Sequence, residues 1–233
     1  MNNIIQHFDL NSQGRDFVVG DIHGYFNLLQ QKLDQVKFNP DTDRLFSLGD
    51  MIDRGPYSRE VLKWIDKPWF FAIKGNHEVM CDQWYNNIDW QKTYAKHGGQ
   101  WFIDLHEYEQ EYYIRAFKQL LNIFEIETPN GLIGLVHAEV PVTDWIVFKN
   151  NFNQYEEQSL WSFNLSNIIK YVRDPYVTNI DYVIHGHSNQ HQPTIYGNRI
   201  YIDTGYLSNE LTLVEINNKN GLIYHHSKGI KNG

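Results

Sequence analysis

The sequence predicts a single α/β domain over residues 1–233, with a helical cap inserted near its middle. Short apolar runs that end in polar or glycine-rich loops recur along the chain, as strands entering loops do. In the first half these runs alternate with stretches of helical spacing, whereas the later part is rich in strand-like runs. No linker separates the two parts, and 233 residues are enough to bury the core of one domain.

The first half is predicted to form strand, helix, strand, helix and strand in succession. Strands entering loops are expected in residues 16–24, 44–50 and 69–78. A helix is expected at 25–36, where apolar side chains recur every three or four residues, and a shorter helix at 58–65. This succession is typical of a βαβαβ unit, in which helices join parallel strands.

The later elements are a cap followed by strands. Residues 78–121 are rich in tryptophan and tyrosine and are predicted to be mainly helical, with a break at Gly98-Gly99. Strands are expected in residues 121–128, 132–139 and 180–188, the first two joined by a Pro-Asn-Gly turn. Two hairpins are expected at 194–205 and 211–226, with turns at Gly197-Asn198 and near Asn220-Gly221.

Composition and charge narrow the classes of function. The chain is 42% hydrophobic and 21% charged, as globular proteins are, and its formal charge of −8 argues against a nucleic-acid or anionic-membrane surface. Cys81 is the only cysteine, so no internal disulfide is possible. The first residues lack the basic and apolar regions of a secretion signal, and no run is long enough to span a membrane. We therefore expect a cytoplasmic protein with no nucleic-acid, membrane or obligate protein partner.

Five polar loops follow predicted strands and share one composition. They read GDIHG (20–24), GDMIDRG (49–55), GNHE (75–78), VHAE (136–139) and HGHS (185–188). Because the carboxyl ends of strands in one α/β sheet meet at a common edge, these loops are expected to form one pocket. Their aspartate, asparagine and histidine side chains offer oxygen and nitrogen ligands without thiolate. Such a set suits Mn, Fe or Zn better than a Ca site.

Each loop alone also has a structural explanation. The GDIHG loop could be a strand-to-helix turn, and Asn76 could cap a helix with Glu78 in its first turn. His137 could be a hydrogen-bonded core histidine, and Arg54 could form a salt bridge with Asp50 or Asp53. All of these explanations would have to hold together and in this order, so a shared site is the better interpretation.

The ordered series GDxHG, GDxxDRG, GNHE, a histidine after a strand, and GHS resembles the phosphoprotein phosphatase (PPP) family of metallophosphoesterases. Within it the chain is similar to the phage-lambda-type and bacterial serine/threonine protein phosphatases. The match spans about residues 16–207 and includes YIDTG at 201–205. It implies the calcineurin-like fold, a central β-sandwich of mixed sheets flanked by helices, with a helical cap insertion.

The resemblance also implies a centre of two divalent metal ions. One metal would be held by Asp21, His23 and Asp50. The other would be held by Asp50 as a bridge, with Asn76, His137 and His187. Manganese is expected for a bacterial-type member, and Fe or Zn would fit the same ligands. His185, the first histidine of HGHS, is expected to have a structural role.

The implied reaction is hydrolysis of phosphoserine and phosphothreonine in a protein or peptide substrate. A hydroxide that bridges the metals would attack phosphorus in line. Arg54 would bind the substrate phosphate together with Asn76. His77 would protonate the leaving oxygen, with Asp53 orienting it.

One position departs from the family pattern. In the related branch a W-x-R segment before the last histidine motif supplies a second arginine for phosphate, whereas Phe163 stands at that position here. Either this contact is missing, or Lys170 or Arg173 supplies it. We prefer Arg173, although it could instead pair with Asp174.

Two other functions compete with this interpretation. Symmetrical diadenosine tetraphosphatases of the same superfamily read more like ARG and GNHD, so the intact DRG and GNHE favour a protein phosphatase. A catalytically silent binding module would be expected to have lost Asp50, Arg54 or His77, and all three are present.

Four aromatic residues of the predicted cap could line a peptide-binding groove beside the metals, or they could pack the cap helices against the sheet. These residues are Trp84, Trp90, Tyr94 and Trp101. His225 and His226 could bind metal but are expected to end a strand.

Overall fold

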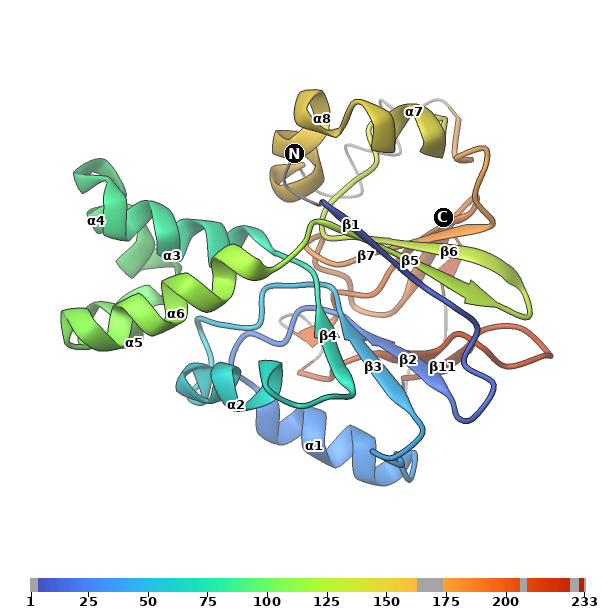
Figure 1. Ribbon diagram of the computed structural model, residues 1–233, viewed down its shortest axis with the longest axis horizontal. Coiled ribbons are helices and arrows are strands. Elements are labelled where there is room, and N and C mark those ends of the chain that lie inside the picture. Colours follow the sequence, from blue (N-terminus) through green and yellow to red (C-terminus); the bar gives the residue numbers. More distant parts are fainter. Residues whose placement is uncertain (1–3, 163–173, 206–208, 227–230, 233) are drawn as a thin grey trace.

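The computed structural model describes residues 4–162, 174–205, 209–226 and 231–232. Two β-sheets pack face to face at its centre, and helices cover their outer faces (Figure 1). This confirms the sandwich of mixed sheets flanked by helices that the family resemblance implies. In the described ranges no helix is both long and apolar enough to cross a membrane.

The smaller sheet has five strands in the order β11-β10-β2-β3-β4. Its strands are β2 (Asp16–Val19), β3 (Arg44–Ser47), β4 (Phe70–Ala72), β10 (Leu213–Glu215) and β11 (Ile223–His225). β2, β3 and β4 are parallel, and their connections contain α1 (Phe26–Gln35), η1 (Ser58–Glu60) and α2 (Val61–Ile65). The strand and helix order predicted for the first half is therefore confirmed. The last predicted hairpin is the antiparallel pair β10 and β11.

The larger sheet has seven strands in the order β1-β5-β6-β7-β9-β8-β12. Its strands are β1 (Ile5–Phe8), β5 (Ile123–Thr128), β6 (Gly131–Val136), β7 (Tyr182–His185), β8 (Thr194–Tyr196), β9 (Arg199–Tyr201) and β12 (Lys231–Asn232). β5 and β6 form an antiparallel hairpin, as do β8 and β9, whereas β7 lies between two parallel neighbours. Both hairpins occur where the sequence predicts them. The prediction that all five polar loops follow strands of one sheet is wrong, because three of the loops follow strands of the smaller sheet and two follow strands of the larger sheet.

Alternation along β2 shows how the five-stranded sheet is buried on both faces. Phe17 and Val19 pack toward α1, whereas Val18 packs between the two sheets, because successive side chains of a strand point to opposite faces. On the far side, α7 (Trp145–Asn150) and α8 (Phe152–Trp161) cover the seven-stranded sheet. These two helices and β1 lie outside the elements that the sequence pattern predicts.

The predicted cap is present and projects to one side of the sandwich (Figure 1). It consists of α3 (Asn76–Asn86), α4 (Ile88–Tyr94), η2 (Ala95–Gly99), α5 (Gln100–Ile103) and α6 (Glu107–Gln119). The predicted break is confirmed, because Gly98 has a φ of 98°. A Cβ atom at Gly98 would lie 2.4 Å from the backbone nitrogen of Arg54, so glycine allows the cap to approach that loop closely.

Candidate active site

The five polar loops converge at one edge of the sandwich. Those after β2, β3 and β4 come from one sheet, and those after β6 and β7 come from the other. Five residues of these loops have a backbone φ between 45° and 72°, a range that residues other than glycine seldom adopt. They are His23, Asp50, Asp53, Arg54 and His187. Strain of this kind gathers at functional sites, where the surrounding structure maintains it.

The first cluster joins His23, Asp21 and Asp50. The Nε2 atom of His23 lies 3.9 Å from an Asp21 carboxylate oxygen and 3.8 Å from an Asp50 oxygen. Its other ring nitrogen, Nδ1, lies 3.0 Å from the carbonyl oxygen of Ile52 and must donate to it. Burial, together with the neighbouring His77, lowers the pKa of His23 to about 3. The ring is therefore neutral, and its Nε2 atom, which carries no proton, lies near both carboxylates.

The second cluster joins His137, Asn76 and His187. The Oδ1 atom of Asn76 lies 2.9 Å from Nε2 of His137 and 2.9 Å from Nδ1 of His187. The Nδ1 atom of His137 lies 2.7 Å from the carbonyl oxygen of Leu48 and must donate to it. Burial lowers the pKa of His137, which keeps the ring neutral. A nitrogen lone pair and an amide oxygen thus face each other, an arrangement that a shared cation would stabilise.

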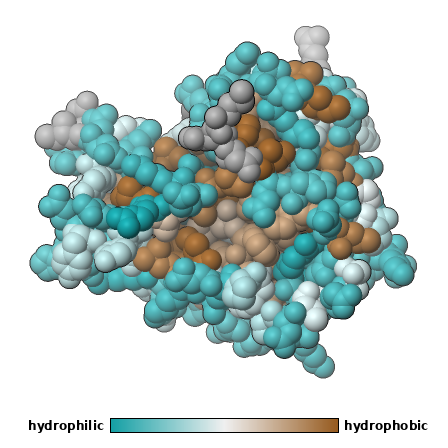
Figure 2. Space-filling view, in the orientation of Figure 1, coloured by the Kyte–Doolittle hydropathy of each residue, from teal (hydrophilic) through white to brown (hydrophobic). Residues whose placement is uncertain are grey.

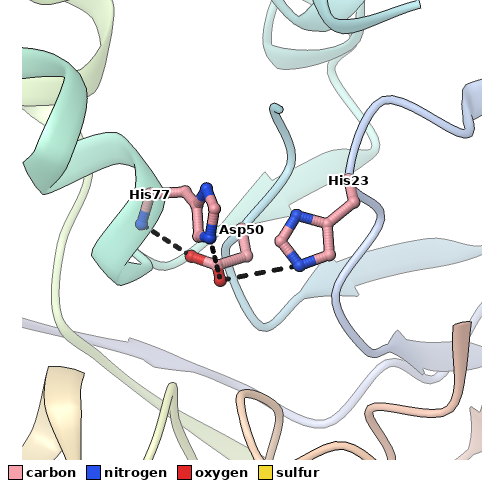
Figure 3. Close-up of side chains that lie close together, drawn as sticks. All are labelled: His23, Asp50 and His77. Carbon is pink, nitrogen blue, oxygen red and sulfur yellow. Dashed lines mark hydrogen bonds and ion pairs between the residues drawn. The ribbon is translucent and has the colours of Figure 1, made fainter. Parts of the chain in front are cut away.

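Asp50 lies between the two clusters. Its Oδ2 atom lies 3.8 Å from Nε2 of His23 and 3.8 Å from Nε2 of His77, and Figure 3 shows the carboxylate between these two rings. Its Oδ1 atom lies 3.5 Å from Nε2 of His137 and accepts the backbone N–H of His77 at 2.9 Å. Although burial acts to raise the pKa of Asp50, the surrounding histidines, His137 foremost, lower it below its usual range.

These side chains fit a pair of divalent metal ions. Asp21 is buried beside Asp50, and burial and the neighbouring carboxylates raise the pKa of Asp21 well above its usual value. Buried carboxylates that repel each other and ring nitrogens without protons require positive charge between them. The ligand atoms of Asp50, His137 and His187 all lie within 4.8 Å of one another, as do those of His23, Asp50 and His77. Oxygen and nitrogen donors without sulfur suit Mn, Fe or Zn.

Arg54 lies at the mouth of the site. Its Nη1 atom lies 2.8 Å from Nε2 of His23, and its Nη2 atom lies 3.2 Å from Nε2 of His77. Because a guanidinium can only donate, both histidine nitrogens accept from it. Arg54 also lines a cavity of about 430 Å³ together with Lys96, His97, Gly98 and Asn189. The cap and the loop after β7 therefore form the walls of the entrance around this cation.

His77 and Asp53 form a buried pair that the cap holds in place. The Nδ1 atom of His77 lies 2.7 Å from Oδ2 of Asp53. The other oxygen of Asp53 accepts the hydroxyl of Tyr94 at 2.9 Å and the indole N–H of Trp101 at 2.7 Å. Burial acts to lower the pKa of His77, but the charge of Asp50 and the hydrogen bond to Asp53 raise it above its usual value. The sequence pattern alone does not reveal this role for Tyr94 and Trp101.

Glu78 is a second residue whose role the sequence does not reveal. It lies in the first turn of α3, as the helix interpretation of GNHE requires. Its carboxylate also accepts the backbone N–H groups of Asp50 at 2.9 Å, Met51 at 2.8 Å and Gly75 at 2.9 Å. The fully buried side chain therefore fixes the loop after β3 against the loop after β4.

The remaining candidates have other surroundings. His185 is buried, with Nδ1 bonded to the carbonyl of Val136 and Nε2 3.8 Å from Glu139, which is held by Arg199 and Tyr201. Phe163, Lys170 and Arg173 lie outside the described residues. Within the described part of the chain, the groups able to hold a metal do not include His225 or His226.

Trp90 faces a different hollow from the one that contains Arg54. It lines a cavity of about 780 Å³ together with Phe117, Leu160 and Trp161, between the cap and α8. Figure 2 shows that the face of the molecule seen in Figure 1 is mostly hydrophilic, with hydrophobic side chains gathered where the cap meets the β-sandwich. Trp84 packs edge to face on Phe102 inside the cap. Within the cap, then, Tyr94 and Trp101 are the aromatics that contact the site.

Comparisons with known proteins agree with this geometry. A profile of the calcineurin-like phosphoesterase family matches residues 17–191. Serine/threonine-protein phosphatase 2 of Escherichia coli (strain K12) is 38% identical over 192 residues, covering 81% of this chain and 86% of its own length. A symmetrical bis(5'-nucleosyl)-tetraphosphatase of Erwinia tasmaniensis is 42% identical over 79 residues, which is 33% of this chain and 29% of its own. A crystal structure described provisionally as a diadenosine tetraphosphatase has a TM-score of 0.63 at 18% identity, covering 94% of this chain and 96% of its own.

Proposed function

Because the chain belongs to the calcineurin-like phosphoesterase family, we propose that it is a serine/threonine protein phosphatase that uses two divalent metal ions. The observation that carries the proposal is the position of Asp50, which joins two ligand clusters beside Arg54 and the His77–Asp53 pair. The substrate is a phosphorylated protein or peptide, and the reaction is hydrolysis of its phosphomonoester.

The ligand atoms divide between two metals as the family resemblance implies. Asp21, His23 and Asp50 would hold one ion, while Asp50, Asn76, His137 and His187 would hold the other. We expect manganese at both positions. When bound, such a pair supplies a hydroxide nucleophile near neutral pH and positive charge for the phosphoryl oxygens.

Arg54 is the group that binds the substrate phosphate. Its guanidinium now donates to His23 and His77, and a phosphate offers it stronger, charge-assisted acceptors at the same mouth. Lys96 adds a second positive charge to the same cavity, and its side chain is exposed to an incoming anion. Lys96 is therefore the described residue placed to compensate for the arginine that Phe163 replaces in the family pattern.

His77 then delivers a proton to the leaving oxygen. Nδ1 is committed to Asp53, so Nε2 is the atom that faces Arg54 and the substrate. When phosphate accepts the hydrogen bonds of Arg54, Nε2 of His77 no longer accepts one and can carry a proton. The charges of Asp50 and Asp53 then stabilise the imidazolium. A serine or threonine alkoxide leaves poorly without such a proton.

The rival function is symmetrical hydrolysis of diadenosine tetraphosphate. The relative named for that activity matches a third of this chain, whereas the protein phosphatase of Escherichia coli matches most of it. Asp53 and Glu78 also favour the phosphatase, since they complete the DRG and GNHE motifs and both are engaged in the site. The silent binding module is disfavoured, because Asp50, Arg54 and His77 lie together.

A direct test compares two substrates with and without metal. The metal-stripped protein is incubated with a phosphothreonine peptide or with diadenosine tetraphosphate, and phosphate or nucleotide release is followed before and after addition of Mn²⁺. We expect Mn²⁺-dependent release from the peptide and little cleavage of the dinucleotide. Rapid cleavage of the dinucleotide with an inert peptide would assign the chain to nucleotide hydrolysis instead.

A further inference from the structure

Asp203 is a buried carboxylate that the roles described above do not use. It follows β9 in the segment YIDTG, and its exposed fraction is 1%. Neither of its carboxylate oxygens has a hydrogen-bond partner among the described residues. A buried carboxylate normally accepts several hydrogen bonds or pairs with a cation, because leaving it bare is costly.

Other buried acids of the described chain show this rule. Glu139 is bound by Arg199 and Tyr201, and Asp16 is bound by Arg44. Glu78 accepts three backbone N–H groups, and Asp53 accepts from His77, Tyr94 and Trp101. Asp203 therefore differs from the acids that stabilise the fold through partners of their own. The difference needs an explanation outside ordinary packing.

The backbone fixes Asp203 beside the first ligand cluster. A Cβ atom placed on Gly20 would lie 3.3 Å from Cα of Asp203, and Gly20 immediately precedes Asp21. The carbonyl of Asp203 accepts the N–H of Gln190 at 2.7 Å, which ties this segment to the loop that carries His187. Asp203 thus lies between the loop of Asp21 and the loop of His187. The charge of Asp203 also opposes that of Asp21, since burial and then Asp203 raise the pKa of Asp21.

We propose that Asp203 is a positioning residue of the metal centre, whose negative charge strengthens binding of a divalent cation by Asp21, His23 and Asp50. The inference rests on the metal centre of the proposed function and adds a residue to which the family resemblance assigns no role. It explains why no partner for Asp203 occurs among the residues that the structure describes, because a cation held beside Asp21 offsets the buried charge of Asp203. It also explains why a buried carboxylate is retained next to the loop that carries Asp21.

The test is metal binding by the variant Asp203→Asn, which keeps the shape of the side chain and removes its charge. Calorimetric titration of the metal-stripped protein with Mn²⁺ is expected to show affinity at one of two sites reduced about 10- to 100-fold, as for other residues that support metal ligands. The melting temperature of the metal-free variant is expected to rise, since the repulsion with Asp21 is gone. Asp41→Asn, which removes a charge from an exposed turn, is expected to change neither quantity.

Three results would overturn the inference. Unchanged Mn²⁺ affinity in a folded Asp203→Asn protein, with wild-type affinity intact, rejects the role of Asp203 but leaves the proposed function standing. A lower melting temperature of the metal-free variant with unchanged affinity would assign Asp203 to fold stability. Failure of the wild-type chain to bind Mn²⁺ at all would overturn the proposed function as well. If Asp203→Asn does not fold, Asp203→Ser carries the same expectations.

Discussion

Replacing Asp50 with asparagine is expected to reduce hydrolysis of a phosphothreonine peptide by about three orders of magnitude or more, because a metal centre contributes several kcal/mol to the transition state. One oxygen of Asp50 faces His23 and the other faces His137, so a single neutral amide cannot serve both clusters. We also expect the purified variant to contain less manganese than the wild type, which elemental analysis measures.

The control for Asp50→Asn is again Asp41→Asn, which changes the net charge equally and leaves the site untouched. Its activity and metal content should match the wild type. Full metal content in Asp50→Asn would rule out the bridging role, even if activity were lost.

Replacing His77 with asparagine is expected to slow hydrolysis of the phosphothreonine peptide about 10²- to 10⁴-fold, the usual contribution of a general acid. p-Nitrophenyl phosphate should be affected far less, because p-nitrophenolate leaves without a proton. The ratio of the two kcat values therefore isolates proton donation from phosphate binding. Nε2 of His77 lies 3.8 Å from Oδ2 of Asp50, a proposed metal ligand. The manganese content of the same samples therefore has to be measured, to separate loss of the proton donor from loss of metal.

A matched control for His77→Asn is His191→Asn, since His191 is an exposed histidine. It should behave as the wild type toward both substrates. An equal loss of both activities in His77→Asn, with manganese retained, would show that His77 is not the proton donor.

The sequence names most of the side chains that the fold brings together, because each polar loop directly follows a strand. The strand-and-loop pattern and the family resemblance together predict that these side chains lie in one region, and the structure brings them together: Asp21, His23, Asp50, Asn76, His77, His137 and His187. Of the two histidines in HGHS, His187 has φ of 57° and faces the site, whereas His185 is directed into the body of the fold. The family pattern makes this distinction, and the spacing of the residues does not.

What the sequence could not predict depends on contacts between distant segments. β1 pairs with β5, and Ile5 lies opposite Ile123, a register that no local pattern encodes. The residues that support the site could not be predicted for the same reason. Tyr94 and Trp101 look like ordinary apolar cap residues until the break at Gly98 brings them to Asp53. Asp203 resembles any polar residue after a strand, and only the structure shows that its buried oxygens have no hydrogen-bond partner in the described part of the chain.

The most direct test of the account is a titration of Mn²⁺ into the metal-stripped protein while hydrolysis of a phosphothreonine peptide is followed. If Asp50 joins two metal positions, activity should rise and level off at two equivalents of Mn²⁺ per chain. Full activity at one equivalent, or activity independent of added metal in a protein shown to be metal-free, would contradict the two-metal phosphatase proposed for this chain.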